Sequence, residues 1–289
     1  MDTVRRIENS LMAAVASATG SDCPPRLASA LAYAVFPGGA RIRPQLCLAV
    51  ALANGDPHPE VSSAAAAALE LIHCGSLVHD DLPCFDDAAL RRGKPSVHAA
   101  YGEPLALLVG DALIVLAFEY LARESAQVPE RLAPLVAVLG RAVGGPRGII
   151  AGQAWECEPS VDVRAYHDAK TGALFSGATV AGAVAAGVDP APWHALGARL
   201  GEAYQVADDL RDATAESAVV GKPVRVDEAL GRPSAVAELG VDGAARRLED
   251  LVSGALDSIP DCVGRVHLLA AIRAQAERIL EGSKAACAA

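Results

Sequence analysis

Two groups of aspartates stand out among the residues of this chain that could do chemistry. The first places Asp80, Asp81, Asp86 and Asp87 within eight residues, and Pro83 predicts that an apolar helix ends at the first pair. Carboxylates are unfavourable at that position, because a helix C-terminus is the negative end of the helix dipole. The four carboxylates also repel one another. A bound cation would relieve both this repulsion and the unfavourable interaction with the helix dipole, so the spacing predicts a cation site.

The second group lies on a later predicted helix and consists of Gln205, Asp208, Asp209 and Asp212. Asp208 and Asp212 are four residues apart and share one helix face with Gln205. Oxygen donors without paired His or Cys favour Mg²⁺ over Zn²⁺, and Mg²⁺ completes its shell with water and substrate phosphate. Two opposed faces of this kind would hold a diphosphate, although either group alone also fits a solvated acidic helix end.

Basic residues that could bind phosphate directly lie in four short segments, 37–44, 91–95, 170–172 and 221–223. Arg suits this task because its planar fork matches two phosphate oxygens at once. Each segment alone fits a salt-bridged surface turn equally well.

Helices must position these residues. The chain is rich in Ala, the best helix former, and Gly and Pro clusters separate segments of roughly 15–25 residues with apolar positions at helical spacing. We expect an all-α bundle of about ten helices in one domain over residues 1–289, because no Gly-, Ser- or Pro-rich linker divides the chain. Residues 213–234 form a polar segment longer than usual helix connections.

Composition narrows the class of protein further. A hydrophobic content of 52% excludes a disordered chain, and a net charge of −10 argues against nucleic-acid partners and anionic membranes. The most apolar stretch, 105–122, contains Asp111 and Glu119, which favours a buried helix over a membrane span. Seven scattered Cys without a CxxC pair, and no apolar leader, predict a reduced, cytoplasmic protein.

Taken in order over residues 38–233, these motifs resemble those of the trans-isoprenyl diphosphate synthases. The resemblance rests on Asp80-Asp81-x₄-Asp86, Arg91-Arg92-Gly93, Lys170-Thr171, Gln205-x₂-Asp208-Asp209-x₂-Asp212 and Gly221-Lys222. The residues around Asp80 are most similar to bacterial short-chain members, in particular geranylgeranyl diphosphate synthases of carotenoid pathways.

The resemblance implies an isoprenoid synthase fold with helices around a deep central cleft, and a homodimer in which the 105–122 helix is the candidate interface. It also implies that the chain condenses isopentenyl diphosphate with an allylic diphosphate, farnesyl or shorter, to a C20 product. Two to three Mg²⁺ ions would bind with the substrate and assist its ionisation, which precedes condensation and proton loss. A C15 synthase is the alternative. A non-catalytic regulatory subunit is disfavoured because both aspartate motifs are complete, and a terpene cyclase because only 4% of residues are aromatic.

Roles for individual residues also follow from the resemblance. The metal ligands would be Asp80, Asp81, Asp86, Asp208, Asp209 and Asp212. The residues that hold the allylic diphosphate would be Arg91, Lys170, Lys222 and Arg232, and those that hold isopentenyl diphosphate would be Arg43, His73 and Arg92. The carbocation would be stabilised by Lys170, Thr171 and Gln205. Glu156 matches an acidic position near the metals. Without the resemblance, His73 would be interpreted as a core histidine.

The length of the prenyl chain in the product is expected to depend on the helix before Asp80. Gly75 stands where bacterial farnesyl synthases have an aromatic residue, and Ser76 follows it. Glycine cannot block a growing prenyl chain, so we expect C20. Phe118 and its neighbours Leu113, Ile114 and Ala117 are candidates for a deeper floor of the pocket, although each of them also fits a role in core packing.

The chain departs from the family pattern in two segments. Ala40 replaces a Lys that would contact isopentenyl diphosphate, and the adjacent Arg41 is the expected substitute. In the lid segment, Arg225 replaces a Gly and Arg232 replaces a Lys.

Overall fold

A computed structural model describes residues 3–36, 39–214 and 234–287, and most of these residues are helical. The α-helices are α1 Thr3–Ala18, α2 Pro25–Val35, α3 Ile42–Ala53, α4 Pro59–Asp80, α5 Val97–Tyr101, α6 Glu103–Glu124, α7 Pro129–Val143, α8 Ile149–Ala154, α9 Val163–His167, α10 Ala173–Ala186, α11 His194–Thr214, α14 Ala235–Asp257 and α15 Arg265–Cys287. The 3₁₀ turns η1 Trp155–Cys157 and η3 Ala191–Trp193, the π-helix η2 Asp168–Gly172 and the two-residue strands β1 Leu90–Arg91 and β2 Lys94–Pro95 complete the described elements. The all-α prediction is confirmed, and the described helices beyond the expected ten are short ones such as α5 and α9.

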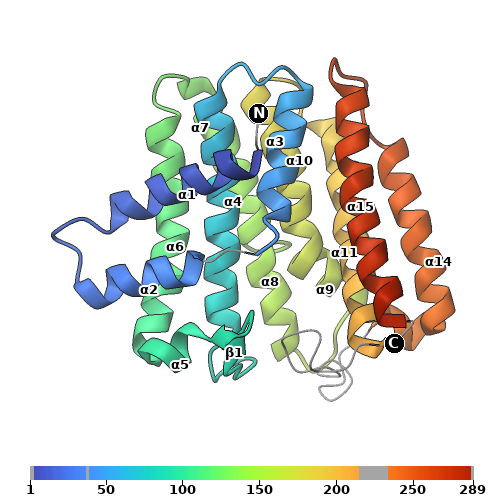
Figure 1. Cartoon of the computed structure of the whole chain (residues 1–289), viewed down its shortest axis with the longest axis horizontal. Coiled ribbons are helices and arrows are strands. Elements are labelled where there is room, and N and C mark those ends of the chain that lie inside the picture. Colours follow the sequence, from blue (N-terminus) through green and yellow to red (C-terminus); the bar gives the residue numbers. More distant parts are fainter. Residues whose placement is uncertain (1–2, 37–38, 215–233, 288–289) are drawn as a thin grey trace. The chain divides into compact units, whose positions relative to one another are not determined.

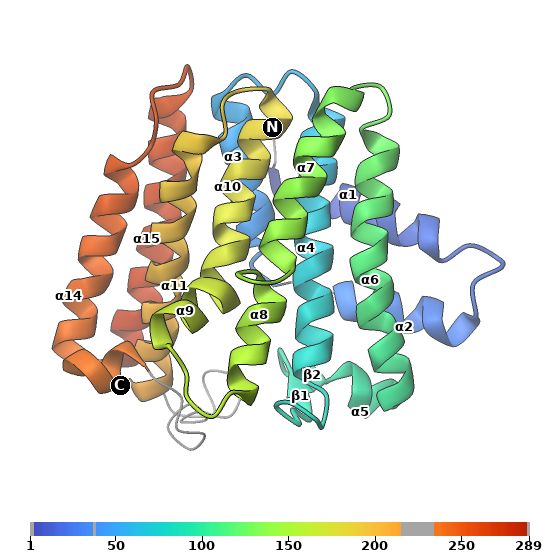
Figure 2. The same ribbon diagram turned by 180° about the vertical axis from the view of Figure 1, so that it is seen from behind.

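The chain forms two compact units, Met1–Leu139 with Ala181–Asp189, and Gly140–Val180 with Pro190–Ala289. In the first unit α4 packs against α6 and α3, and both views show α4 beside α6 (Figures 1 and 2). In the second unit α11 packs against α14 and α15, which lie beside it in the same views. The single domain expected over 1–289 stays a prediction.

Helix α4 is the central element of the first unit. Pro59 starts the helix, where its missing N–H costs no hydrogen bond, and the run Ala64–Ala68 is fully buried. Such small side chains let neighbouring helices surround α4. The helix ends at Asp80 with Asp81 as its C-cap, so the burial of its upstream part fixes where the first aspartate pair lies.

Two glycines bring α4 and α6 close together. A Cβ atom on Gly75 would lie 3.1 Å from the Gly110 carbonyl oxygen, and one on Gly110 would lie 2.0 Å from His79 Nε2. The imidazole of His79 therefore occupies the space that a side chain at position 110 would need. This contact positions the residue directly before Asp80.

In the second unit, α11 buries one face against α14. The shared core consists of Ala203, Val206, Ala207, Leu210, Ala244, Leu248 and Leu251. Ser234 caps the start of α14 by accepting a hydrogen bond from the Ala237 N–H at 3.1 Å. Because Val206 and Leu210 point into this core, Gln205, Asp208 and Asp212 project from other parts of the α11 surface.

By length and hydropathy, α4 and α6 could each cross a membrane. In α4, however, 78% of the most apolar window is buried within the protein, as in the core helix of a globular domain. In α6 the corresponding share is 44%, so an apolar part of this helix is uncovered in the single chain.

Candidate functional site

The first aspartate motif lies at the end of α4 in the first unit, where the chain turns sharply. The Asp86 N–H donates to the Asp80 carbonyl at 3.0 Å, and the Ala88 N–H donates to the Asp81 carbonyl at 3.2 Å. This turn holds the motif's carboxylates on one short stretch of chain. Asp81 is 2% exposed, whereas Asp80 and Asp86 are half-buried.

Arg91 of β1 grips Asp81. Its Nε donates to both carboxylate oxygens, at 2.9 and 3.2 Å, and its Nη2 donates to Oδ1. Burial raises the pKa of the Asp81 carboxyl above its ordinary value, although Arg91 acts in the opposite direction. Burial lowers the pKa of Arg91, but the hydrogen bond and charge of Asp81, together with the charges of Asp80 and Asp86, raise it overall. Arg91, predicted to hold the allylic diphosphate, thus lies directly beside a predicted metal ligand.

A second cluster in the same unit contains the residues predicted to bind isopentenyl diphosphate. Arg43, in the first turn of α3, lies with Nη1 3.4 Å from His73 Nε2 on α4. The Arg92 guanidinium lies against the backbone of Gly39, where a Cβ atom would be 2.5 Å from Nη2. Burial lowers the pKa of His73 well below its ordinary value, with smaller contributions of the same sign from Arg43 and Arg92. The imidazole is therefore neutral and close to positive charge, which suits an anionic ligand.

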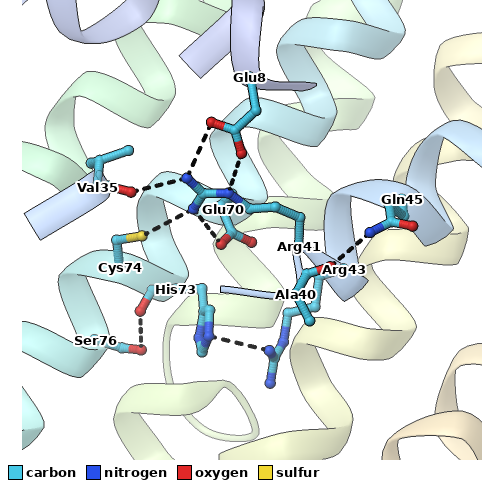
Figure 3. Close-up of polar contacts among 10 residues, drawn as sticks. All are labelled: Glu8, Val35, Ala40, Arg41, Arg43, Gln45, Glu70, His73, Cys74 and Ser76. Carbon is cyan, nitrogen blue, oxygen red and sulfur yellow. Dashed lines mark hydrogen bonds and ion pairs between the residues drawn. The ribbon is translucent and has the colours of Figure 1, made fainter. Parts of the chain in front are cut away.

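Arg41 does not replace the Lys that is missing at Ala40. Its side chain is buried and turned away from Arg43 and His73, toward Glu8 and Glu70 (Figure 3). The expectation that it contacts isopentenyl diphosphate is wrong for this structure. The physical reason is that two carboxylates within the protein already neutralise its charge.

In the second unit, a chain of hydrogen bonds joins η2, α11 and the start of α14. The Thr171 hydroxyl donates to Gln205 Oε1 at 2.8 Å, and Gln205 Nε2 donates to Asp209 Oδ1 at 2.9 Å. Asp209 Oδ2 accepts from the Ala235 N–H at 2.7 Å. The structure thus brings Thr171, Gln205 and Asp209 together in one hydrogen-bonded group.

The two adjacent aspartates of α11 have different surroundings. Asp209 is 4% exposed, and its Oδ2 joins α11 to the start of α14. Asp208 accepts from Arg211 Nη2 at 2.9 Å, and its side chain is 35% exposed. Asp208 is therefore the more accessible of these two predicted ligands, and Asp212 is half-buried one turn further along α11.

Glu156 lies beside Lys170 in the second unit. It accepts hydrogen bonds from Lys170 Nζ, from the Tyr166 hydroxyl at 2.7 Å and from Gln153 Nε2 at 3.0 Å. Lys170 Nζ also lies 5.6 Å from the centre of the Tyr166 ring. The structure therefore pairs Glu156 with Lys170, and its expected position near the metal ions stays a prediction.

Two residues of this region were missed by sequence reasoning, Tyr166 and Gly152. Tyr166 is four residues before Lys170, which is the helical spacing that could have indicated their contact. A Cβ atom on Gly152 would lie 2.4 Å from the Lys170 backbone N, so α8 approaches η2 at its backbone. A glycine beside Gln153 in an apolar helix is the available signal for such close approach.

The described carboxylates suit Mg²⁺ by their chemistry. Among the described residues, no three or more His, Cys, Asp or Glu side chains gather as a ready-made metal site. Mg²⁺ needs no such cage, because it is normally held by one or two carboxylates together with substrate phosphate and water. Asp80, Asp86 and Asp208, which are all partly exposed, fit that requirement.

Of the residues predicted to control the length of the product, Gly75 lies where α4 packs against α6. A Cβ atom on Gly75 would face Leu113 Cβ at 3.4 Å and Ile114 Cγ1 at 3.6 Å. Ser76, on the next position of α4, donates to the His73 carbonyl at 2.9 Å, and Phe118 on α6 is half-buried. Lys222, Arg225 and Arg232 lie outside the described residues.

Comparison with known proteins places these features in context. Residues 24–267 match the family model described as Polyprenyl synthetase. The chain is 58% identical to the geranylgeranyl diphosphate synthase of Cereibacter sphaeroides, over 98% of both chains, and 52% identical to that of Rhodobacter capsulatus, over 97% of both.

Solved structures show the same fold. A geranyltransferase from Legionella pneumophila has a TM-score of 0.81 at 28% identity, covering 98% of this chain and 95% of its own. A Helicobacter pylori geranyltransferase, complexed with magnesium and isoprenyl diphosphate, has a TM-score of 0.74 at 28% identity, covering 99% and 96%. The predicted fold class is confirmed.

Proposed function

Because this chain belongs to the polyprenyl synthetase family, we propose that it is a geranylgeranyl diphosphate synthase, which joins isopentenyl diphosphate to an allylic diphosphate. The observation that carries the proposal is the near-full-length similarity to two proteins of that name. The prediction made from the motifs agrees with both names. The two aspartate groups and the Arg43–His73 pair supply the side chains that the reaction needs.

The allylic diphosphate is bound through Mg²⁺ by the carboxylates of both motifs, Asp80, Asp81 and Asp86, and Asp208, Asp209 and Asp212. Two to three ions held there with the substrate would supply Lewis-acid chemistry, because their charge would neutralise that of the departing diphosphate. Arg91, Lys170, Lys222 and Arg232 bind its remaining oxygens. The magnesium and isoprenyl diphosphate in the Helicobacter pylori relative support this assignment.

The second substrate binds at Arg43, His73 and Arg92. The two guanidiniums supply positive charge, and the neutral imidazole of His73 can donate one hydrogen bond to a phosphate oxygen. Because no Lys stands at position 40, this pocket has one cation fewer than the family pattern. Its affinity therefore depends more strongly on the placement of Arg43.

Loss of the diphosphate leaves an allylic cation, which the double bond of isopentenyl diphosphate then attacks. The Thr171 hydroxyl, Gln205 and the Lys170 carbonyl offer partial negative charge to the cation without being strong nucleophiles. The Thr171–Gln205 hydrogen bond holds these two side chains in fixed orientations. The released diphosphate takes up the proton lost after condensation, so the chain needs no general base.

The decisive experiment is incubation of the purified chain with farnesyl diphosphate, isopentenyl diphosphate and Mg²⁺, followed by chromatography of the products. We expect a C20 product and no reaction when a chelator removes the metal. A C15 product from shorter starters, without extension of farnesyl diphosphate, would favour a farnesyl synthase. No product from any allylic starter would overturn the proposal in favour of a regulatory subunit.

The proposal includes a cytoplasmic homodimer without nucleic-acid partners or membrane insertion. In α6, Leu107, Leu108 and Val115 are 49%, 55% and 64% exposed. Exposed apolar residues on one helix are typical of a protein interface. A second copy of the chain is the occupant that the family resemblance favours. Supply of the product to carotenoid formation also stays a prediction.

A further inference from the structure

Arg41 lies at the centre of a buried polar cluster that the proposed reaction does not use (Figure 3). All five of its N–H groups have an acceptor. Nε donates to Glu8 Oε1 at 2.8 Å, and Nη1 donates to Glu70 Oε1 at 2.8 Å and to Cys74 Sγ at 3.9 Å. Nη2 donates to the Val35 carbonyl at 2.9 Å and to Glu8 Oε2 at 3.5 Å.

These contacts join three helices of the first unit to the start of a fourth. Glu8 belongs to α1, Val35 is the last residue of α2, Glu70 lies on α4, and Arg41 itself is the N-cap of α3. The Val35 carbonyl is at the end of its helix, where carbonyls lack intrahelical partners and a cation is favourable. Burial lowers the pKa of Arg41, but the two carboxylates together raise it further, so the guanidinium stays charged.

The cluster joins the start of α3 to α4 close to the Arg43–His73 contact. Arg43 follows Arg41 by two residues, and His73 follows Glu70 by three, which is about one helical turn. The Arg41–Glu70 and Arg43–His73 contacts therefore join the same two segments at adjacent levels. From this geometry we infer that Arg41 is a positioning residue, which holds Arg43 beside His73 in the isopentenyl diphosphate pocket. The inference rests on the function proposed above.

A role in stability alone explains these features less well. Buried ion pairs are often replaceable by apolar residues without loss of stability. Arg41 also has a left-handed backbone conformation, with φ +50°. Residues other than glycine rarely adopt this conformation, and it persists only where the surrounding structure imposes it. A buried ion pair and a strained backbone at Arg41 are both expected if this residue fixes the orientation of the nearby Arg43 side chain.

The test is the substitution Arg41→Lys, which keeps the positive charge but removes the planar guanidinium. A single ammonium group cannot bind acceptors on three helices at once. We expect KM for isopentenyl diphosphate to rise about tenfold, because small misplacements of binding groups cost this much or more. KM for farnesyl diphosphate should stay within about twofold. The matched control is Arg6→Lys, because Arg6 is also poorly exposed and binds Asp56, Ser62 and Ser63. It should change neither constant.

If Arg41→Lys does not give folded protein, Glu70→Gln decides, since it keeps the shape and an oxygen acceptor. Calorimetric titration with isopentenyl diphosphate alone makes the same comparison without turnover. If the wild-type protein were inactive, the proposed reaction would be overturned. The dissociation constants of the wild type and the variants for isopentenyl diphosphate would still test the role of Arg41. Folded variants with wild-type affinity for isopentenyl diphosphate, or with equal loss for both substrates, would overturn it.

Discussion

Asp81 is a carboxylate that the fold buries at the C-terminal end of a helix, an environment that disfavours its charge. Arg91 compensates only in part, because the pKa of Asp81 remains raised. A divalent cation would compensate further. Asp81 is therefore an electrostatic burden in the metal-free protein, which the proposed binding of Mg²⁺ and diphosphate would relieve.

Replacing Asp81→Asn separates these two effects. We expect kcat to fall by at least about 100-fold, as for the loss of other preorganised electrostatic groups. Thermal stability without metal should be unchanged or higher, because the amide oxygen still accepts from Arg91. Steady-state kinetics and thermal melts measure both quantities, with exposed Asp87→Asn as the control. More than a tenth of wild-type kcat in Asp81→Asn would contradict the assignment.

His73 predicts a pH dependence of stability. Its folded-state pKa is lowered, so below pH 6.5 the unfolded chain takes up a proton that the folded protein does not. The contribution of His73 to the free energy of unfolding is therefore fully present above pH 6.5. Below pH 6.5 it decreases by at most ~1.4 kcal/mol per pH unit. Urea unfolding at pH 6.5, 6.0 and 5.5, without ligands, should show a flatter dependence for His73→Gln. The same flattening in His58→Gln, whose side chain is 36% exposed, would refute this explanation.

At the level of elements, the close approach of α4 to α6 controls the space around Gly75. In Gly75→Phe, the ring must lie toward Leu113 and Ile114, because Gly110 blocks the backbone side. We expect a shift from C20 toward C15 product together with a lower melting temperature, since α6 must move by a few tenths of an ångström. Product chromatography and melts measure both. A folded variant that still makes only C20 would show that the prenyl chain extends elsewhere.

The contact between α8 and η2 supports a parallel prediction in the second unit. In Gly152→Ala, the methyl group would collide with the Lys170 backbone at 2.4–2.5 Å, so η2 must shift and carry Lys170 and Thr171 with it. We expect kcat to fall about 100-fold. Gly140→Ala is the matched control, because nothing lies within 4 Å of its added Cβ and a helical alanine should stabilise by roughly 0.5–1 kcal/mol. Equal activities of the two variants would contradict the positional role of η2.

At the level of the whole molecule, the uncovered apolar face of α6 predicts the oligomeric state. Leu108 and Val115 are seven residues apart and therefore share one face of the helix. Leu108→Lys should convert the proposed dimer to a monomer, because a buried unpaired charge is costly at an interface. Sedimentation or light scattering measures the mass. Met12→Lys, at an equally exposed residue of α1, should remain dimeric, and dimers of both variants would exclude this face.

Local spacing alone determined much of this protein. Helical periodicity and the Gly and Pro punctuation were sufficient to predict an all-α chain, because both act within a few residues. The two aspartate motifs, with Arg91 and Lys170, were sufficient to predict the family, because their order and spacing are specific. Those inferences depend on residue type and short-range geometry, which a sequence contains directly.

The tertiary structure decided the roles of neighbours within those motifs. Arg41 and Arg43 are two residues apart, yet one is buried against Glu8 and Glu70 while the other lies beside His73. The left-handed backbone of Arg41 breaks the regular helical spacing that would predict their directions. Its partner Glu8 is 33 residues away in the chain. Contacts at such separation follow from how the helices pack, and no local pattern contains them.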